Sequence, residues 1–88
     1  MTDDRAGEVA ATPADLELDC RGMLCPLPVI ELARHHTEVA VGGLVALVTT
    51  DVAAATDVPA WCRMRDQEYA GAEAAPDGAV RHLVRRLS

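Results

Sequence analysis

Apolar and polar residues follow two different periods along this chain, and the two periods predict a series of short strands and helices. Residues 16–19 (LELD) alternate apolar and acidic side chains, which is typical of a strand with one buried face. Residues 44–50 (LVALVTT) are almost wholly apolar and β-branched, as expected of a strand in the middle of a sheet. Residues 68–74 (EYAGAEA) predict a weaker strand, and residues 79–86 (AVRHLVRR) alternate well enough to predict a last one.

The segment after the first strand has the spacing of a helix. Its apolar positions are three or four residues apart and share one helical face: Val29, Leu32, His36 and Val39. This helix is predicted to begin at Pro26 or Pro28, because the N–H that proline lacks has no intrahelical partner in a first turn. It is predicted to end at Gly42–Gly43, since glycine commonly follows the last turn of a helix.

Residues 52–66 predict a second helix that Asp51 can cap. An interruption is expected within it, because Asp57 can cap a new first turn that contains Pro59. Residues 76–78 (PDG) predict a turn before the last strand. The order β-α-β-α-β-β favours an α/β (α+β) two-layer sandwich, in which a four-stranded mixed sheet carries both helices on one face.

Composition and charge narrow the classes of function. Half of the 88 residues are apolar, so the chain is expected to fold, around a core of Val, Leu, Ile and Ala because it has no phenylalanine. Its formal net charge of −6, with no lysine, argues against direct nucleic-acid binding, which depends on neutralising phosphates. No apolar run has the length of a membrane span, so no membrane contact is expected.

The domain organisation is expected to be simple. Residues 1–14 are acidic, contain Ala, Thr and Pro without a sustained period, and predict a flexible N-terminal tail rather than a secretory signal. Residues 15–88 then form a single domain. Three cysteines, an odd number without a signal, indicate a reducing compartment, so a cytoplasmic protein is expected. The free protein is also expected to be a monomer.

Cys25 is the candidate reactive residue. It lies at or just before the start of the first predicted helix, where unpaired N–H groups and the helix dipole favour a thiolate over the usual thiol pKa of about 8.5. Arg21 could add to this effect, and the Gly22 turn together with Pro26 and Pro28 presents the residue at a strand-to-helix loop. Cys25 is therefore predicted to be a reactive, low-pKa nucleophile, the alternative being a small buried residue before a helix.

Two segments of the chain resemble a known family. Residues 18–28 (LDCRGMLCPLP) resemble the TusA/SirA-like family of small sulfur-carrier proteins, whose hallmark is Cys-Pro-x-Pro after a short strand and a glycine turn. Residues 49–62 (TTDVAAATDVPAWC) are similar to that family's second-helix segment, in which Asp precedes an Asp-x-Pro-x-aromatic-Cys pattern. The resemblance covers about residues 16–86.

The resemblance implies a cytoplasmic sulfurtransferase that works without a cofactor or metal. Its Cys25 would carry sulfane sulfur as a persulfide, with Arg21, Gly22, Pro26 and Pro28 in supporting positions. The sulfur would come from a cysteine desulfurase or a rhodanese-like donor. It would pass to an acceptor protein in tRNA thiolation, cofactor synthesis or sulfur oxidation, and little activity is expected without these partner proteins.

The other cysteines have competing interpretations. Cys20 could resolve the Cys25 persulfide by forming a disulfide, or it could be a small packed residue at the end of a strand. Cys62 is expected in the core. Zinc binding by the three cysteines and His82 is disfavoured, because only Cys20 and Cys25 are closely spaced and no second closely spaced pair completes a four-ligand site.

Two functions of other classes stay open at this point. A thiol redox or regulatory module could use Cys20 and Cys25 as a dithiol. A non-catalytic binding module is the other, because the predicted β-α-β-α-β-β order also resembles the C-terminal domain of translation initiation factor three. The acidic charge argues against RNA contact by such a module.

Overall fold

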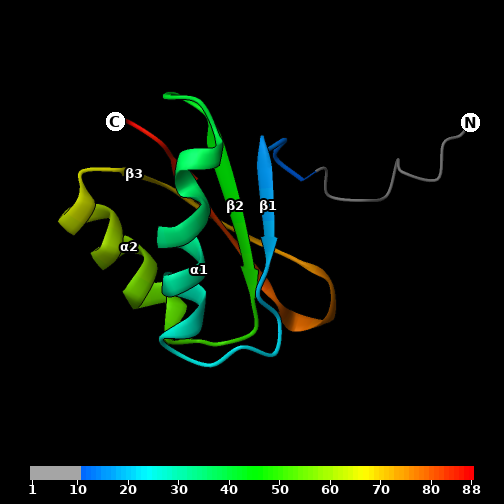
Figure 1. Cartoon of the computed structure of the whole chain (residues 1–88). Helices are drawn as coiled ribbons and strands as arrows, with labels where there is room; N and C mark the ends of the chain where they lie inside the picture. Colours follow the sequence, from blue (N-terminus) through cyan, green and yellow to red (C-terminus); the bar gives the residue numbers. More distant parts are fainter. Residues whose placement is uncertain (1–10) are drawn as a thin grey trace, which may run out of the picture.

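The computed structural model describes residues 11–88, in which two helices pack on a four-stranded sheet (Figure 1). Its strands are β1 (Leu16–Asp19), β2 (Leu44–Thr49), β3 (Glu68–Ala74) and β4 (Val80–Arg85). Its helices are α1 (Leu27–His35) and α2 (Ala54–Arg65), and the short 3₁₀ turns are η2 (His36–Glu38) and η3 (Pro76–Gly78). The predicted element order and fold class are confirmed.

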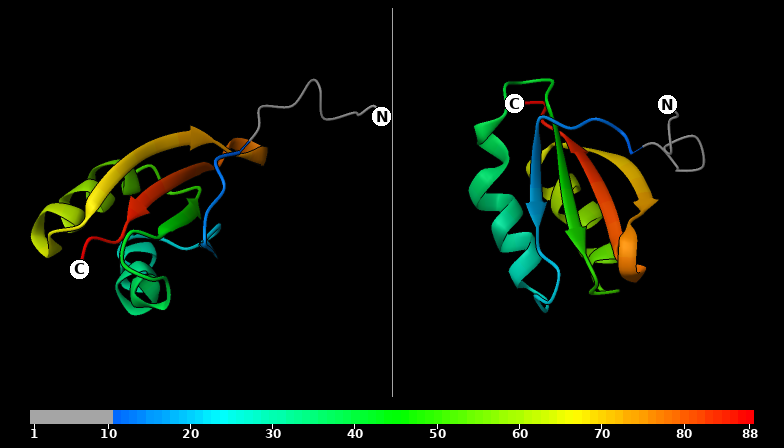
Figure 2. Two further views of the ribbon diagram at one scale, coloured as in Figure 1. Left: turned by 90° about the horizontal axis from the view of Figure 1, so that it is seen from above. Right: turned by 90° about the vertical axis from the view of Figure 1, so that its right-hand side faces the viewer.

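The sheet has the order β1-β2-β4-β3 and is mixed. β1 and β2 are parallel, and β4 pairs antiparallel with both β2 and β3. A parallel pair needs a crossover connection, and α1 supplies it between β1 and β2. All residues of the central strand β2 are buried, as its apolar run predicted. Figure 2 shows that both helices cover the same face of the sheet.

The main core lies between this face and the helices. Most of its buried members come from α1, α2, β2 and β4, and they include Leu32, Val45, Leu47, Val58, Trp61 and Val84. The four positions of the predicted apolar face turn inward, although only Val29 and Leu32 lie within α1. Leu32, His36 and Val39 are buried, and the partly buried Val29 packs against the core. The ring of His36 packs edge-on against Trp61, with 5.0 Å between ring centroids.

The predicted end of the first helix is wrong. α1 ends at His35 and passes into η2, well before Gly42. The side chain of Arg86 explains this early end, because its Nη1 donates to the carbonyl oxygens of Thr37 (3.3 Å) and Val39 (2.7 Å). These carbonyls have partners without a further helical turn.

The predicted interruption of the second helix is also wrong, since α2 is continuous and Pro59 lies inside it. One face of α2 is buried against the sheet along its length, through Ala54, Val58, Trp61 and Cys62. We attribute the continuity of the helix to this packing, which outweighs the hydrogen bond that Pro59 cannot make.

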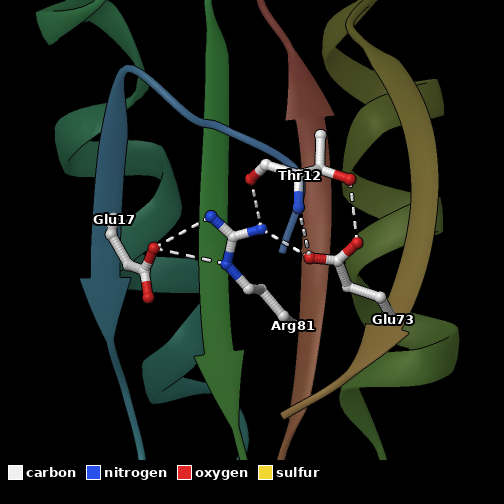
Figure 3. Close-up of polar contacts among 4 residues, drawn as sticks. All are labelled: Thr12, Glu17, Glu73 and Arg81. Carbon is white, nitrogen blue, oxygen red and sulfur yellow. Dashed lines mark hydrogen bonds and ion pairs between the residues drawn. The ribbon is translucent and has the colours of Figure 1, made fainter. Parts of the chain in front are cut away.

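The N-terminal segment is held against the other face of the sheet from Thr12 onward, before the predicted domain boundary at residue 15. Thr12 donates from its hydroxyl to Glu73 Oε1 at 2.8 Å and from its N–H to Glu73 Oε2 at 3.1 Å (Figure 3). Ala14 packs on a small apolar cluster of Leu44, Ala46 and Leu83. The rest of the predicted tail, residues 1–10, lies outside the described residues.

Arg81 connects this segment to the sheet. Its guanidinium donates to Glu17 Oε1 (2.9 Å from Nη2), to Glu73 Oε2 (2.6 Å from Nη1) and to the carbonyl oxygen of Thr12 (2.7 Å from Nη1), as Figure 3 shows. Its side chain is only 8% exposed. Arg81 therefore joins β1, β3, β4 and the N-terminal segment at one point.

His82 gives the stability of the fold a predictable pH dependence. It is 2% exposed and shares a 2.9 Å hydrogen bond with the hydroxyl of Tyr69, and burial lowers the pKa of its ring. A histidine whose pKa is lower in the folded state stabilises the fold above its unfolded pKa of about 6.5, and this contribution is lost as the pH falls. The wild-type protein should therefore lose stability between about pH 7 and pH 5.

A His82→Gln variant tests this expectation by urea unfolding at a series of pH values. The variant lacks the titrating ring, so the difference in free energy of unfolding between wild type and variant should shrink as the pH falls. A difference that is constant across this range would contradict the assignment.

Candidate functional site

Cys25 lies on the loop that joins β1 to α1. The turn at Gly22, with φ of +83°, redirects the chain after β1, and the N–H of Gly22 donates to Thr50 Oγ1 at 3.3 Å. α1 begins at Leu27, between the two predicted starts, and Pro28 occupies its first turn. The thiol of Cys25 is exposed. The predicted placement of a cysteine just before a helix, on an accessible loop, is confirmed.

Asp51 ties this loop to the start of α2. Its Oδ2 accepts a 2.6 Å hydrogen bond from the N–H of Cys25, and its Oδ1 accepts one of 3.0 Å from the N–H of Ala53. The sequence predicted only the second kind of contact, in which Asp51 caps the following segment. The first contact fixes the backbone of Cys25 relative to α2.

Asp57, in the first turn of α2, meets the thiol itself. Cys25 Sγ donates to Asp57 Oδ2 at 3.0 Å. Sequence reasoning assigned Asp57 to capping a broken helix and missed this contact. The signal that could have found it is the Asp-x-Pro-x-aromatic-Cys pattern, which the family resemblance singled out without assigning a role to its aspartate.

The expected low pKa of Cys25 is wrong, because the thiol pKa is raised. The main cause is the hydrogen bond to Asp57, followed by burial and by the negative charges of Asp57 and Asp51. A carboxylate that accepts the S–H bond stabilises the thiol, and two nearby negative charges destabilise the thiolate.

The start of α1 has few backbone N–H groups that could stabilise the thiolate against these negative charges. Pro26 and Pro28 have no N–H, and the N–H of Leu27 already donates to the carbonyl oxygen of Leu24 at 2.8 Å. The two prolines that position Cys25 therefore also remove two of the donors on which the expected effect depends.

Arg21 is engaged elsewhere. It forms a two-pronged contact with Asp19, with Nε–Oδ1 and Nη2–Oδ2 distances of 2.8 Å. This contact lowers the pKa of Asp19 to about 2. The expected contribution of Arg21 to a low Cys25 pKa is not seen, because its charge is balanced within the pair.

The surface around the thiol is mainly apolar. A shallow depression of about 250 Å³ next to Cys25 is lined by Pro26, Val29, Asp57, Ala60, Trp61 and Met64. Four large apolar side chains from the segments around the site are exposed, and we call them the apolar collar: Leu24, Leu27, Val52 and Met64. Large apolar side chains exposed on segments next to a reactive residue are typical of a surface that another protein covers.

Cys20 and Cys62 are packed in the core, with exposures of 1% and 2%. Burial raises the pKa of both thiols, that of Cys62 to about 11. The N–H of Cys20 donates to the carbonyl oxygen of Val48 and extends the β1–β2 pairing. Cys62 is in the core as predicted, and the structure supports the interpretation of Cys20 as a packed strand-end residue.

Two features of other classes of function are absent from residues 11–88. No three histidine, cysteine or carboxylate side chains there are grouped so that they could hold a metal ion. Within the same residues, no helix is long and apolar enough to cross a membrane.

Alkylation should distinguish the three thiols by access. We expect iodoacetamide to label Cys25 well before Cys20 or Cys62, because a buried thiol reacts only when the fold opens. Peptide mapping after brief labelling measures the order, and labelling in urea provides the control in which all three react. Earlier labelling of Cys20 or Cys62 in the folded protein would contradict the structure.

Comparison with known proteins gives matches along most of the chain. Residues 16–86 match the family model described as Sulfurtransferase TusA. The sulfur carrier protein TusA of Pseudomonas syringae is 34% identical over 74 residues, which are 84% of this chain and 87% of that protein. A longer Bacillus subtilis protein, YrkF, whose name also refers to a sulfur carrier, is 29% identical over 73 residues. The match covers 83% of this chain but only 39% of that protein.

A solved structure supports the fold independently. The SirA-like protein from Desulfitobacterium hafniense superposes with a TM-score of 0.71, and the match covers 83% of this chain and 99% of that one. The sequence identity is 16%, so this likeness concerns the fold alone.

Proposed function

This chain belongs to the TusA family of sulfurtransferases, and we propose that it is a sulfur carrier that holds sulfane sulfur as a persulfide on Cys25. The observation that carries the proposal is the exposure of Cys25 on a loop tip, while the other two cysteines are buried. A carrier has to bring its sulfur into the active site of another protein. An accessible loop next to a helix start suits that task.

The proposed chemistry is two successive thiol exchanges. Cys25 Sγ attacks the outer sulfur of a donor's persulfide, a new S–S bond forms on Cys25, and the donor's cysteine leaves with the electron pair of the broken bond. A nucleophile of the acceptor then attacks the outer sulfur on Cys25, and the Cys25 thiol is restored. Neither exchange requires an external oxidant, a metal or a cofactor.

The surface favours protein partners for both exchanges. The apolar collar around Cys25 can be covered by a partner that brings its own reactive cysteine to the loop. The net charge of −6 favours encounter with basic surfaces and disfavours direct nucleic-acid contact. We propose a cysteine desulfurase or rhodanese-like protein as donor, and an acceptor protein in tRNA thiolation, cofactor synthesis or sulfur oxidation.

The redox alternative, a Cys20–Cys25 dithiol, has less support. Cys20 is 1% exposed and burial raises the pKa of its thiol, so it is poorly placed to attack a sulfur on an exposed loop. No observation on the described residues favours the binding-module alternative over the carrier.

Intact-mass measurement tests the carrier function. Incubated with a cysteine desulfurase and cysteine, the wild-type protein should gain one sulfur atom, and a thiol reductant should remove it. Loss of two hydrogens without added sulfur would indicate a disulfide and favour the redox module. No change in mass with either a desulfurase or a rhodanese-like donor would contradict the proposal.

A further inference from the structure

We propose that Asp57 is a catalytic residue of this site, and that its carboxylate takes the proton from the Cys25 thiol as Cys25 attacks the donor's persulfide. The inference rests on the proposed carrier function and assigns the proton transfer within it. It gives a specific role to the thiol–carboxylate contact between the Cys25 loop and the first turn of α2.

The geometry is that of a base in contact with the group it deprotonates. Asp57 Oδ2 is 3.0 Å from Cys25 Sγ, within the hydrogen-bond reach of about 2.6–3.2 Å expected of a general base. Asp57 belongs to a helix packed on the sheet, and Asp51 holds the N–H of Cys25 at 2.6 Å. Both partners of the proton transfer are therefore positioned by the fold before a donor arrives.

No better base lies at the thiol among the described residues. The two depressions at Cys25 are lined, besides Asp51 and Asp57, by Pro26, Pro28, Val29, Ala54, Ala60, Trp61 and Met64, none of which can accept a proton. Both oxygens of Asp51 already accept backbone N–H groups, whereas Asp57 contacts the thiol proton directly. The charged pair of Arg21 and Asp19, on the same loop, is engaged within itself.

A base is needed here because the site keeps Cys25 as a thiol. Its pKa is raised, Pro26 and Pro28 supply no N–H at this helix start, and the N–H of Leu27 already has a partner. The thiolate is the nucleophile in sulfur exchange, so the resting site is protected from stray electrophiles but is slow by itself. A carboxylate in contact removes the proton only when the reaction proceeds.

Each bond formed in this step is matched by a bond that breaks. The S–H bond of Cys25 breaks, its proton moves to Asp57 Oδ2, and its electron pair forms the new S–S bond to the outer sulfur of the donor's persulfide. The donor's S–S bond breaks, and its electron pair stays on the donor's cysteine as a thiolate. That thiolate takes the proton from Asp57, so the carboxylate is restored and nothing is oxidised or reduced overall.

An Asp57→Asn variant of the full chain tests this role through two readouts that move in opposite directions. The ultraviolet absorbance of the thiolate, with Cys25→Ser as the baseline, should titrate at lower pH in the variant, because the carboxylate that stabilises the thiol is gone. Persulfide loading from the same donor should nevertheless be about 100-fold slower than wild type at pH 6, within the range of general base catalysis.

The ratio of the two loading rates removes the donor's own pH dependence. Below the thiol pKa the variant depends on its thiolate fraction, so its deficit of about 100-fold at pH 6 should close by about tenfold per pH unit and vanish at about pH 8. Equal loading at high pH also shows that the variant is folded. Asp51→Asn is the matched control. It removes the second nearby carboxylate but leaves Asp57 at the thiol, so below the thiol pKa its rate relative to wild type should not change with pH.

Loading of Asp57→Asn at pH 6 that equals or exceeds wild type would overturn the inference and leave Asp57 only as a group that suppresses ionisation. A pH-dependent deficit in Asp51→Asn instead would assign the proton to Asp51 and overturn it as well. Both results require that the wild-type protein loads. Failure of the carrier function itself would appear separately, as a wild type that gains no sulfur.

Discussion

Replacing Cys25 by serine is expected to abolish sulfur loading completely. A serine hydroxyl does not ionise near neutral pH and forms no stable bond of the S–S kind, so the variant has no group at the loop that can hold sulfur. Cys20 and Cys62 cannot substitute, because both are buried and burial raises the pKa of both thiols. Intact mass after incubation with a cysteine desulfurase and cysteine gives the answer directly.

Cys20→Ala and Cys62→Ala are the matched controls for this loss. Each removes one thiol from the core, and each should still accept one sulfur, although lower stability is expected from the atoms removed. A loaded form that lives longer in Cys20→Ala than in wild type would show that Cys20 resolves the persulfide. Loading that survives in Cys25→Ser would refute the carrier assignment at this site.

The largest effect on stability outside the core is expected for Arg81→Met, at about 2 kcal/mol. Removing one partner of a buried ion pair typically costs about 3–5 kcal/mol, because the other charge is left uncompensated. The expectation here is smaller, since Glu17 is 55% exposed and can be solvated. Glu73, at 22% exposure, and the carbonyl oxygen of Thr12 would lose their donor. Urea unfolding measures the difference.

Arg85→Met is the matched control on the same strand. Arg85 also pairs with a glutamate of β3, Glu68, but both side chains are about half exposed. Such a pair contributes little, so its loss should cost no more than about 0.5 kcal/mol. Equal destabilisation by the two variants would show that the contacts of Arg81 contribute no more to stability than an exposed ion pair. Neither variant should change the loading rate of folded protein, since both side chains lie away from Cys25.

Local signals in the sequence were enough to predict the secondary-structure elements, their order and their buried faces. Period-two and period-three-to-four patterns depend only on which face of an element is buried, so they predicted the element order, the buried strand β2 and the apolar face of α1. Glycine and proline act on their own backbone, so the accessible loop that carries Cys25 was also predictable. The helix ends were not, because Arg86 and the packing of α2 decided them from elsewhere in the chain.

The electrostatics of the site were decided by the tertiary structure alone. Asp51 and Asp57 lie 26 and 32 residues after Cys25, and the sequence offered capping as a sufficient reason for both. Packing of α2 beside α1 brings their carboxylates to the thiol and reverses the direction of its expected pKa shift. A pKa depends on charges and donors within a few ångströms, whatever their separation along the chain. The sequence by itself therefore determined which cysteine is presented, and only the fold decided in which protonation state it is held.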